Sequence, residues 1–442
     1  MDIDALTDDD RKQLAKDLAA ELDTGLYGNR AVLSRRQLLS IAGGSAGVAG
    51  LTALGVDPAT AQSAAGQVGT EASPEDVYAY NLDVQGALQR DLDAGGQAIS
   101  NVGSLSTTEG RITGSETITI NVPTDKATIS DAFVTASETI PPRSGVGVLI
   151  NVESGHEIQE QIQVLNGTYG HITIQSEDPL VNLSPGFSDG TIINIENSKA
   201  PIIDFMIEAQ GNNNKSGIRV FNSVLNIKEG SGVTNSGERG LFIHGNSVVD
   251  ALNTDFSNAT NQCIRVTTAS TANIQGVNAT GGEDGLFASR GCIVSANEAD
   301  FSNSTDRGVD CRQSQVAMAN STVNGTGDNA IRAVRGGTVI APSSTINNCT
   351  ATEVIDSQYG ATVVVPLCDI DNPSSTVFFC RDGSRINATD GTITNSGAGE
   401  DLRILRGGIM SVNNTTVGGA AVSDSDANVS LNTIQSQGII FR

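Results

Sequence analysis

Hydrophobic residues recur with a period of 22 to 24 residues from about residue 240 to the C-terminus. The first recurring position holds, in successive repeats, Leu241, Ile264, Leu286, Val309, Ile331, Ile355, Phe378 and Leu402. Two residues later every repeat again has a residue that can be buried: Ile243, Val266, Ala288, Cys311, Ala333, Ser357, Cys380 and Ile404. A spacing of two is typical of a β-strand that turns one face inward. Each repeat is therefore expected to contain a short strand at this point.

Two further strands are expected in every repeat. The second has its inward residues eight and ten positions after the first column, which in the repeat of Val309 are Ala317 and Ala319. The third strand is marked by Phe256, Val277, Phe301, Val323, Ile346, Ile370, Ile393 and Val417. Three short strands per coil of about 23 residues predict an all-β parallel β-helix. A leucine-rich horseshoe is excluded because the repeats have no leucine consensus. A propeller is excluded because it would need about 40 residues per blade.

The part of the chain before residue 231 has a less regular pattern. Residues 1–33 contain a short amphipathic helix and are expected to serve attachment, and residues 34–61 carry the run SRRQLL ahead of a mildly apolar stretch. Residues 62–115 are polar and Gly-rich, which suits a stem or linker. Residues 116–230 hold strand-like runs and an amphipathic stretch at 127–136, and regular coils follow over 231–442.

These features resemble the right-handed parallel β-helices of the pectate-lyase-like superfamily. In that family a helix such as 127–136 caps the open end of the first coil, and corner asparagines form a ladder in which each side chain bonds the neighbouring corner backbone. The matching asparagines here are Asn258, Asn303, Asn348, Asn372 and Asn395. Residues 92–105 (LDAGGQAISNVGSL) resemble a motif of tailed-virus fibre stems, and residues 34–39 with Ala59-Thr60-Ala61 resemble a cleavable twin-arginine export signal.

The charge of the chain limits its partners and its environment. There are 26 Lys and Arg against 50 Asp and Glu, so the formal net charge is −24, which excludes a nucleic-acid binder that works through a basic surface. Six of the basic residues are lysines, which leaves 26 − 6 = 20 arginines. Acidic, lysine-poor proteins are typical of high salt, where the Debye length is about 3 Å at 1 M. We infer a halophilic, archaeal source.

A line of outward residues beside the first column offers the clearest candidate chemistry: Phe242, Arg265, Phe287, Asp310, Arg332, Asp356, Phe379 and Arg403. Asp310 and Asp356 would lie two coils apart, about 9.6 Å, with Arg332 between them. That separation is near the upper end for the carboxylates of an inverting glycosidase, about 6.5 to 9.5 Å. Arg332 could instead pair with a uronate, and the interpretation that we favour over catalysis is a solvated ladder of alternating charges. Enzymatic activity, as a glycoside hydrolase or polysaccharide lyase, therefore stays open.

The corner before this strand collects negative charge, including Glu283, Asp284 and Asp306, which could hold Ca²⁺ through carboxylate oxygens or form a hydrated surface. No motif for a nucleotide, flavin or haem site is present. The six cysteines lie within the repeats without a CxxC pair and are interpreted as small buried residues, although export would permit disulfides.

Outward positions of the second strand predict an oligomer interface. Met318, Ile340 and Val364 would form an exposed apolar strip among polar neighbours. Such a strip would be buried in a homotrimer, as in viral tailspikes, or covered by a flanking loop.

Two functions remain open, because fold alone does not assign function. The first is a virion appendage of a halophilic archaeal virus, such as a tail fibre, tailspike or capsid spike. It would join other virion proteins through its N-terminal region and bind a host-surface glycan or glycoprotein. The alternative is a twin-arginine-exported surface protein of a haloarchaeon that degrades or adheres to acidic polysaccharide.

Overall fold

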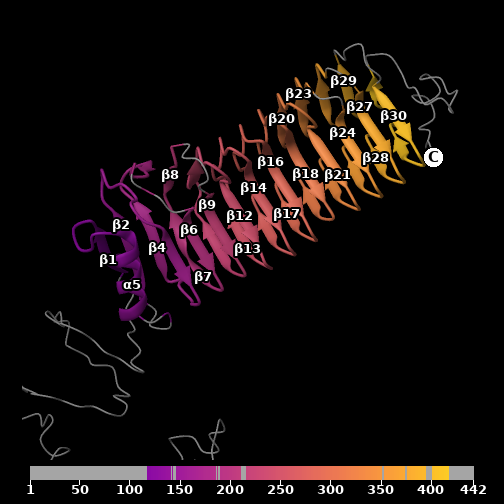
Figure 1. The fold of residues 1–442 in the computed structure, drawn as a ribbon. Helices are drawn as coiled ribbons and strands as arrows, with labels where there is room; N and C mark the ends of the chain where they lie inside the picture. Colours follow the sequence, from indigo (N-terminus) through magenta and orange to yellow (C-terminus); the bar gives the residue numbers. More distant parts are fainter. Residues whose placement is uncertain are drawn as a thin grey trace, which may run out of the picture. The chain divides into compact units, whose positions relative to one another are not determined.

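The computed structural model describes residues 117–417, apart from 141, 143–145, 186, 188–189, 211–215, 351–352, 374–375 and 395–400. The predictions for residues 1–33, 34–61 and 62–115 lie outside this range, as do Asn395 and both N-terminal sequence motifs. The described part is a parallel β-helix, as the repeat predicts, because every strand pairing within its sheets is parallel and joins successive coils (Figure 1).

The longest sheet has thirteen strands and is called sheet 1. In spatial order it contains β1 (Thr117–Val122), β2 (Gly147–Val152), β4 (Ile172–Ser176), β7 (Lys199–Asp204), β10 (Val224–Ile227), β13 (Val248–Ala251), β15 (Thr271–Asn273), β17 (Ile293–Ser295), β19 (Gln315–Ala317), β22 (Thr338–Ile340), β25 (Thr362–Val364), β28 (Arg385–Asn387) and β31 (Ile409–Ser411).

Sheet 2 has eleven strands and supplies the first strand of each regular coil. Its order is β3 (Ile162–Leu165), β6 (Thr191–Glu196), β9 (Ser216–Phe221), β12 (Leu241–His244), β14 (Gln262–Thr267), β16 (Asp284–Ser289), β18 (Arg307–Arg312), β21 (Ile331–Val334), β24 (Glu353–Gln358), β27 (Thr376–Arg381) and β30 (Leu402–Leu405).

The third face, sheet 3, is built in two pieces joined by isolated bridges through Asp255, Asn278 and Asp300. The three-stranded piece contains β5 (Val181–Asn182), β8 (Met206–Glu208) and β11 (Gly232–Thr234), and the five-stranded piece contains β20 (Thr322–Asn324), β23 (Thr345–Asn347), β26 (Asp369–Asp371), β29 (Thr392–Thr394) and β32 (Thr416–Val417).

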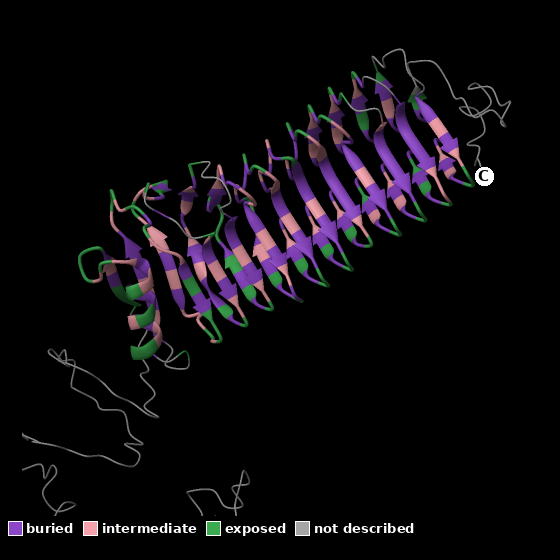
Figure 2. Cartoon of the chain, in the orientation of Figure 1, coloured by how far each residue is buried: buried purple, intermediate pink, exposed green. Residues whose placement is uncertain are grey.

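The register of sheet 2 follows the first predicted column at every step. Leu241 pairs with Ile264, Ile264 with Leu286, and the same alignment continues to Leu402. All eight residues of this column are buried within one continuous apolar core. Figure 2 shows the buried positions following the strands, with exposed residues at the corners.

The second strand of one coil departs from the prediction by one residue. Val294 pairs with Val316, not with Ala317, and the inward residue two further on is Met318, not Ala319. The cause is the turn between β18 and β19, which has two residues where the turn between β16 and β17 has three. A shift of one residue exchanges the inward and outward faces of a strand, so Met318 is fully buried and Ala317 faces outward.

A helix lies at the N-terminal end of the described β-helix, close to the predicted position. Helix α5 (Ile129–Thr139) begins after Thr128, whose hydroxyl accepts a hydrogen bond from the Asp131 backbone N–H at 3.0 Å. Its buried face contains Ile129, Ala132, Phe133 and Ala136 and packs beside β1 and β2 (Figure 1). Among the described residues, no helix is long and apolar enough to cross a membrane.

The corner asparagines adopt left-handed backbone conformations. Asn258, Asn303, Asn348 and Asn372 have φ between 52° and 59°, a region that asparagine tolerates better than most residues. All four side chains are exposed, and the Asn372 amide donates to the Asn348 side-chain oxygen at 2.7 Å. That contact joins two side chains, whereas the predicted ladder joins side chain to backbone. All six cysteines are buried and unpaired, in line with their interpretation as small core residues.

Candidate functional site

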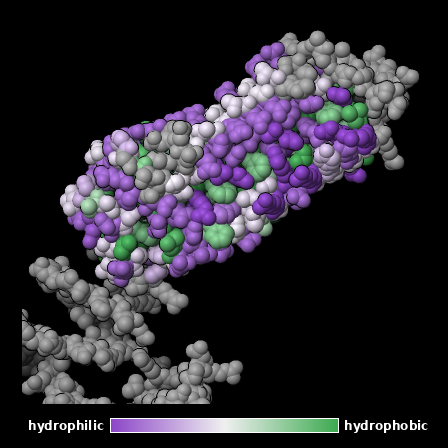
Figure 3. Space-filling view, viewed as in Figure 1, coloured by the Kyte–Doolittle hydropathy of each residue, from purple (hydrophilic) through white to green (hydrophobic). Residues whose placement is uncertain are grey.

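The outward face of sheet 2 gathers the charged and aromatic side chains of the β-helix. The predicted outward line is confirmed, because Phe242, Arg265, Phe287, Asp310, Arg332, Asp356, Phe379 and Arg403 pair in that order across adjacent strands. Adjacent strands lie about 4.8 Å apart, so these residues lie side by side in the line. The view in Figure 3 shows isolated hydrophobic patches set in a hydrophilic surface.

The arginines are concentrated on this one sheet. Of the twelve arginines in the described residues, eleven lie in strands of sheet 2 or within two residues of one, and Arg385 of sheet 1 is the exception. In a chain of net charge −24, this distribution brings the cations together on a face that also holds acidic residues such as Asp284, Asp310 and Asp356. The face divides into two regions with different chemistry.

The first region is an arginine–aromatic patch on β12, β14 and β16, formed by Arg239, Phe242, His244, Arg265 and Phe287. The Arg265 guanidinium lies between two rings, with its central carbon 5.5 Å from the Phe242 centroid and 5.1 Å from the Phe287 centroid. Arg239 covers Phe242 from the other side at 4.9 Å. The Phe242 and His244 rings stack at 4.4 Å with an interplanar angle of 9°.

Arg265 has no carboxylate partner. Among the residues that the structure describes, no acidic oxygen lies within ion-pair distance of its guanidinium, and its Nε has no hydrogen-bond partner. Partial burial lowers the pKa of Arg265, and the nearby positive charge of Arg239 lowers it further. Burial, with the positive charge of Arg219, also lowers the pKa of His244 to about 4, so this ring is neutral at neutral pH. The patch therefore holds, between two partly exposed rings, a guanidinium that has no direct ion-pair partner and that the carboxylates of Glu238 and Asp284 affect only at longer range.

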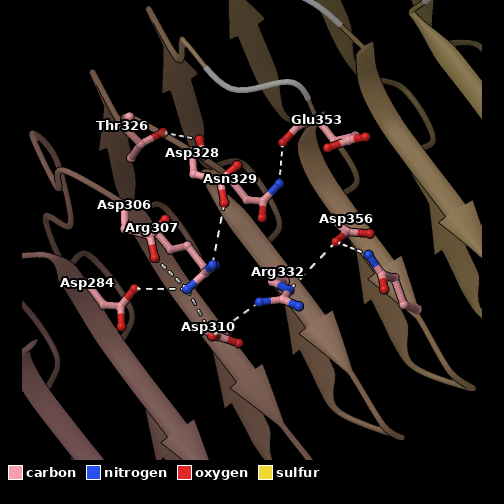
Figure 4. A network of polar contacts seen from close by, with 12 residues as sticks. Asp284, Asp306, Arg307, Asp310, Thr326, Asp328, Asn329, Arg332, Glu353 and Asp356 are labelled. Atoms are coloured by element: carbon pink, nitrogen blue, oxygen red, sulfur yellow. Dashed lines mark hydrogen bonds and ion pairs between the residues drawn. The ribbon is translucent and has the colours of Figure 1, made fainter.

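The second region is a carboxylate network on β16 to β24, drawn in Figure 4. Arg307 lies at its centre and contacts four carboxylates, with N–O distances of 3.6 Å, 2.6 Å, 3.6 Å and 3.5 Å to Asp284, Asp306, Asp310 and Asp328. Here, in contrast to Arg265 of the patch, the guanidinium is paired with carboxylates.

The predicted catalytic residues lie inside this network. Arg332 lies between Asp310 and Asp356, as predicted, with N–O distances of 3.9 Å and 3.7 Å. The Asp310 side chain has no exposed surface, and both its oxygens accept hydrogen bonds from Arg312 at 2.5 to 3.2 Å. Asp356 is 4% exposed and accepts a hydrogen bond from Gln358. The arrangement thus brings the trio together but leaves Asp310 no open approach to a substrate.

Two carboxyl groups of the network hold a proton more tightly than usual. Burial raises the pKa of Asp284 to about 7, and the attraction of Arg307 only partly opposes it. Burial likewise raises the pKa of Asp356 to about 6, against the opposing charge of Arg332. Both groups are at most 4% exposed, so they titrate near neutral pH without facing solvent.

The speculative calcium site does not fit the arrangement. Asp284 and Asp306 both contact Arg307, whose guanidinium lies where a cation would have to bind between them. Glu283 is exposed, and among the described residues no group of three His, Cys, Asp or Glu side chains is arranged to hold a metal ion.

The predicted oligomer strip is corrected at one position. Met318 is fully buried, because the short turn before β19 shifts this strand by one residue. Ala317 occupies the outward position instead. Ile340 is 45% exposed and pairs with Ala317 on one side and partly exposed Val364 on the other. The strip on sheet 1 is therefore Ala317, Ile340 and Val364.

Sequence reasoning missed several residues of the face. Arg239, His244 and Arg312 were not selected, because each lies two or three residues from the outward line and reaches it only through its long or planar side chain. The signal that could have found them is the alternation of Phe and Arg at Phe242, Arg265 and Phe287, since adjacent strands place such pairs at cation–π distance.

Comparisons with known proteins give limited information. No protein-family model matches the sequence, and no curated protein matches it. Among solved structures, the chain is similar to the gp42 tailspike of Acinetobacter phage vb_AbaP_AS12, with a TM-score of 0.39 and 10% sequence identity. The alignment covers 65% of this chain and 60% of the tailspike chain, which is less than two thirds of that protein. The assignment of a parallel β-helix rests on the strand pairings themselves.

Proposed function

We propose that the chain is a virion appendage, a fibre or spike, of a halophilic archaeal virus, and that it binds a glycan or glycoprotein on the host surface. The observation that carries the proposal is the division of the sheet 2 face. Its arginine–aromatic patch is partly exposed and leaves Arg265 without an ion-pair partner among the described residues, whereas Asp310 of the supposed catalytic trio is buried and paired. This arrangement favours binding over catalysis.

Two further features support the same proposal. The acidic, lysine-poor composition suits a protein exposed to high salt, and residues 92–105 resemble a fibre-stem motif. The appendage would be a homotrimer at the virion surface, joined through residues 1–33 to other virion proteins. Its contact between subunits would include the exposed strip of Ala317, Ile340 and Val364, because exposed apolar strips of this kind are found at protein interfaces.

The experiment measures binding of the full-length chain to intact haloarchaeal cells in high salt, together with the intact and oligomeric mass of native material. We expect a full-length trimer that binds cells of a susceptible host, and loses that binding when the surface glycans are removed. A monomer that begins near Gln62 and binds no cells would contradict the proposal and favour an exported protein.

One observation favours the alternative, an exported protein that degrades acidic polysaccharide. Asp284 and Asp356 have pKa values raised by burial to about 7 and about 6, and a general acid needs a pKa near the working pH. Release of reducing or unsaturated ends from an acidic polysaccharide, measured in the same preparation, decides between the two. Loss of that release in Asp356→Asn, but not in the exposed Asp369→Asn, would support the enzyme.

A further inference from the structure

We infer that the arginine–aromatic patch is a subsite for an anionic sugar, one that carries a carboxylate or a sulfate group. This inference rests on the proposed function, because it names the chemical class of the glycan. It is argued from three properties of the patch: an unmatched charge, a ring surface of the right chemistry, and access from solvent.

The unmatched charge belongs to Arg265. Its guanidinium has no acidic oxygen within ion-pair distance among the described residues, and its Nε makes no hydrogen bond. Arg290, one strand further on, is exposed, and no ion pair joins it to another described residue. In a chain with 50 acidic residues, two neighbouring arginines without carboxylates are best matched by an anion from outside.

The geometry of the guanidinium narrows the choice of anion. Its planar fork of N–H donors matches the oxygens of a carboxylate or sulfate two at a time. Arg265 is held between the Phe242 and Phe287 rings, at 5.5 Å and 5.1 Å, so its plane is fixed before a ligand binds. A pre-oriented side chain loses less conformational entropy on binding.

The rings favour a sugar as the carrier of that anion. Phe242 and His244 stack with nearly parallel planes, and both rings are partly exposed. Because His244, Arg239 and Arg265 lie against the Phe242 ring, a sugar would meet this ring at its exposed edge. The apolar C–H groups of a pyranose can contact such an edge while its polar groups stay in water. The pKa of His244 is lowered to about 4, so its ring is neutral at neutral pH. It therefore adds no positive charge to the patch and serves as an aromatic contact.

The test uses the full-length chain at about 1 M salt, where the Debye length is about 3 Å and long-range attraction by the face is suppressed. Probes are polygalacturonate for the carboxylate, dextran sulfate for the sulfate, and uncharged dextran as the matched neutral polymer. Calorimetric affinities are compared for the wild-type chain and Arg265→Met, with Arg385→Met, an exposed arginine of sheet 1, as the control. Circular dichroism verifies that each variant is folded.

We expect one or both charged polymers to bind and dextran not to bind. Arg265→Met should weaken binding about tenfold, since it removes a charge-assisted contact, and Arg265→Lys should recover only part of it. Arg385→Met should leave affinity unchanged. Equal losses in Arg265→Met and Arg385→Met, equal binding of dextran, or equally tight Arg265-dependent binding of polyglutamate would each overturn the inference.

The same variants separate this inference from the proposed function. If Arg265→Met binds host cells as well as the wild-type chain does, the anionic subsite is wrong while host attachment stands. If the charged polymers bind through Arg265 but no haloarchaeal cell is bound, the subsite stands and the attachment function is wrong.

Discussion

The arginine–aromatic patch and the carboxylate network lie on the same sheet, in one register, and differ by the residues on the neighbouring strands. Arg265 has Phe242 and Phe287 beside it, whereas Arg332, in the same outward line, has Asp310 and Asp356. In the first region the positive charge is left for a ligand, and in the second it is compensated within the protein. The residue type is the same, so the role of each arginine is set by what the adjacent coils place next to it.

The two regions should also differ in what they contribute to stability. An ion-pair network that is largely buried adds little over an apolar core, but removing one partner leaves the other charges unopposed. Removing one side chain from the patch should cost less, because cation–π contacts are each worth about 0.5 to 1 kcal/mol at exposed sites. Stability and ligand binding are therefore expected to separate along the face.

The largest expected effect is the loss of stability in Arg307→Met. This variant leaves Asp284, Asp306 and Asp310 without their shared cation, and we expect the free energy of unfolding to fall by about 3 kcal/mol. Arg265→Met is the matched comparison; it removes two cation–π contacts and should cost about 1 to 2 kcal/mol. Urea denaturation at fixed salt, followed by circular dichroism, measures both. Similar losses in the two variants would show that the regions do not differ in the way argued.

The network should lose stability as the pH rises, whereas His244 of the patch, with its pKa lowered to about 4, should add stability as the pH rises toward about 6.5. The pKa of Asp284 is about 7 in the folded chain, against an ordinary 3.8, so the native state binds this proton more tightly than the unfolded chain does. The resulting stabilisation is complete below about pH 3.8 and is lost as the pH rises through about 7. The amide in Asp284→Asn cannot ionise, so this variant should not lose stability in this way as the pH rises.

We therefore expect the unfolding free energy of wild type, relative to Asp284→Asn, to fall by about 2 kcal/mol between pH 5 and pH 8. Thermal and urea unfolding across that range measure the difference. Asp369→Asn, at an exposed position of β26, is the control and should run parallel to wild type. If the unfolding free energy of Asp284→Asn also runs parallel to that of wild type, then Asp284 is not the source of the pH dependence.

Most of this architecture could be predicted from the sequence because the coils are nearly equal in length. The period aligned Leu241 through Leu402 correctly and, with it, the whole outward line from Phe242 to Arg403. The error at Met318 came from the one turn that is a residue shorter, since a period measured between first strands does not reveal which corner of a coil has changed length.

The chemistry of the site was less predictable than its positions. The sequence placed Arg332 between Asp310 and Asp356, but it did not reveal that Arg312 reaches back to Asp310 from two residues away and takes up both of its oxygens. It also gave no signal that Arg307 would fill the space between Asp284 and Asp306. Long side chains that cross between strands decide which charges stay available, and their rotamers are not encoded in a repeat.

Phe287→Glu is expected to change stability least, and it is the sharpest test of the comparison between the patch and the network. Position 287 pairs with Arg265 on one side and Asp310 on the other, so a carboxylate there gives Arg265 the partner that the network arginines already have. The new, partly exposed ion pair contributes about 0 to 1 kcal/mol. The lost ring contacts with Arg265 and Arg312 are worth about 0.5 to 1 kcal/mol each, so the free energy of unfolding should fall by about 1 kcal/mol.

Binding of the charged polymers, in contrast, should fall as far in Phe287→Glu as in Arg265→Met, because the internal carboxylate competes for the same guanidinium. Thr271→Glu is the matched control: it adds the same charge to the coil of Arg265, at an exposed position of sheet 1, and should leave affinity unchanged. If Phe287→Glu still binds the polymers at wild-type affinity, then the absence of a counter-ion at Arg265 is not what makes this region a binding surface.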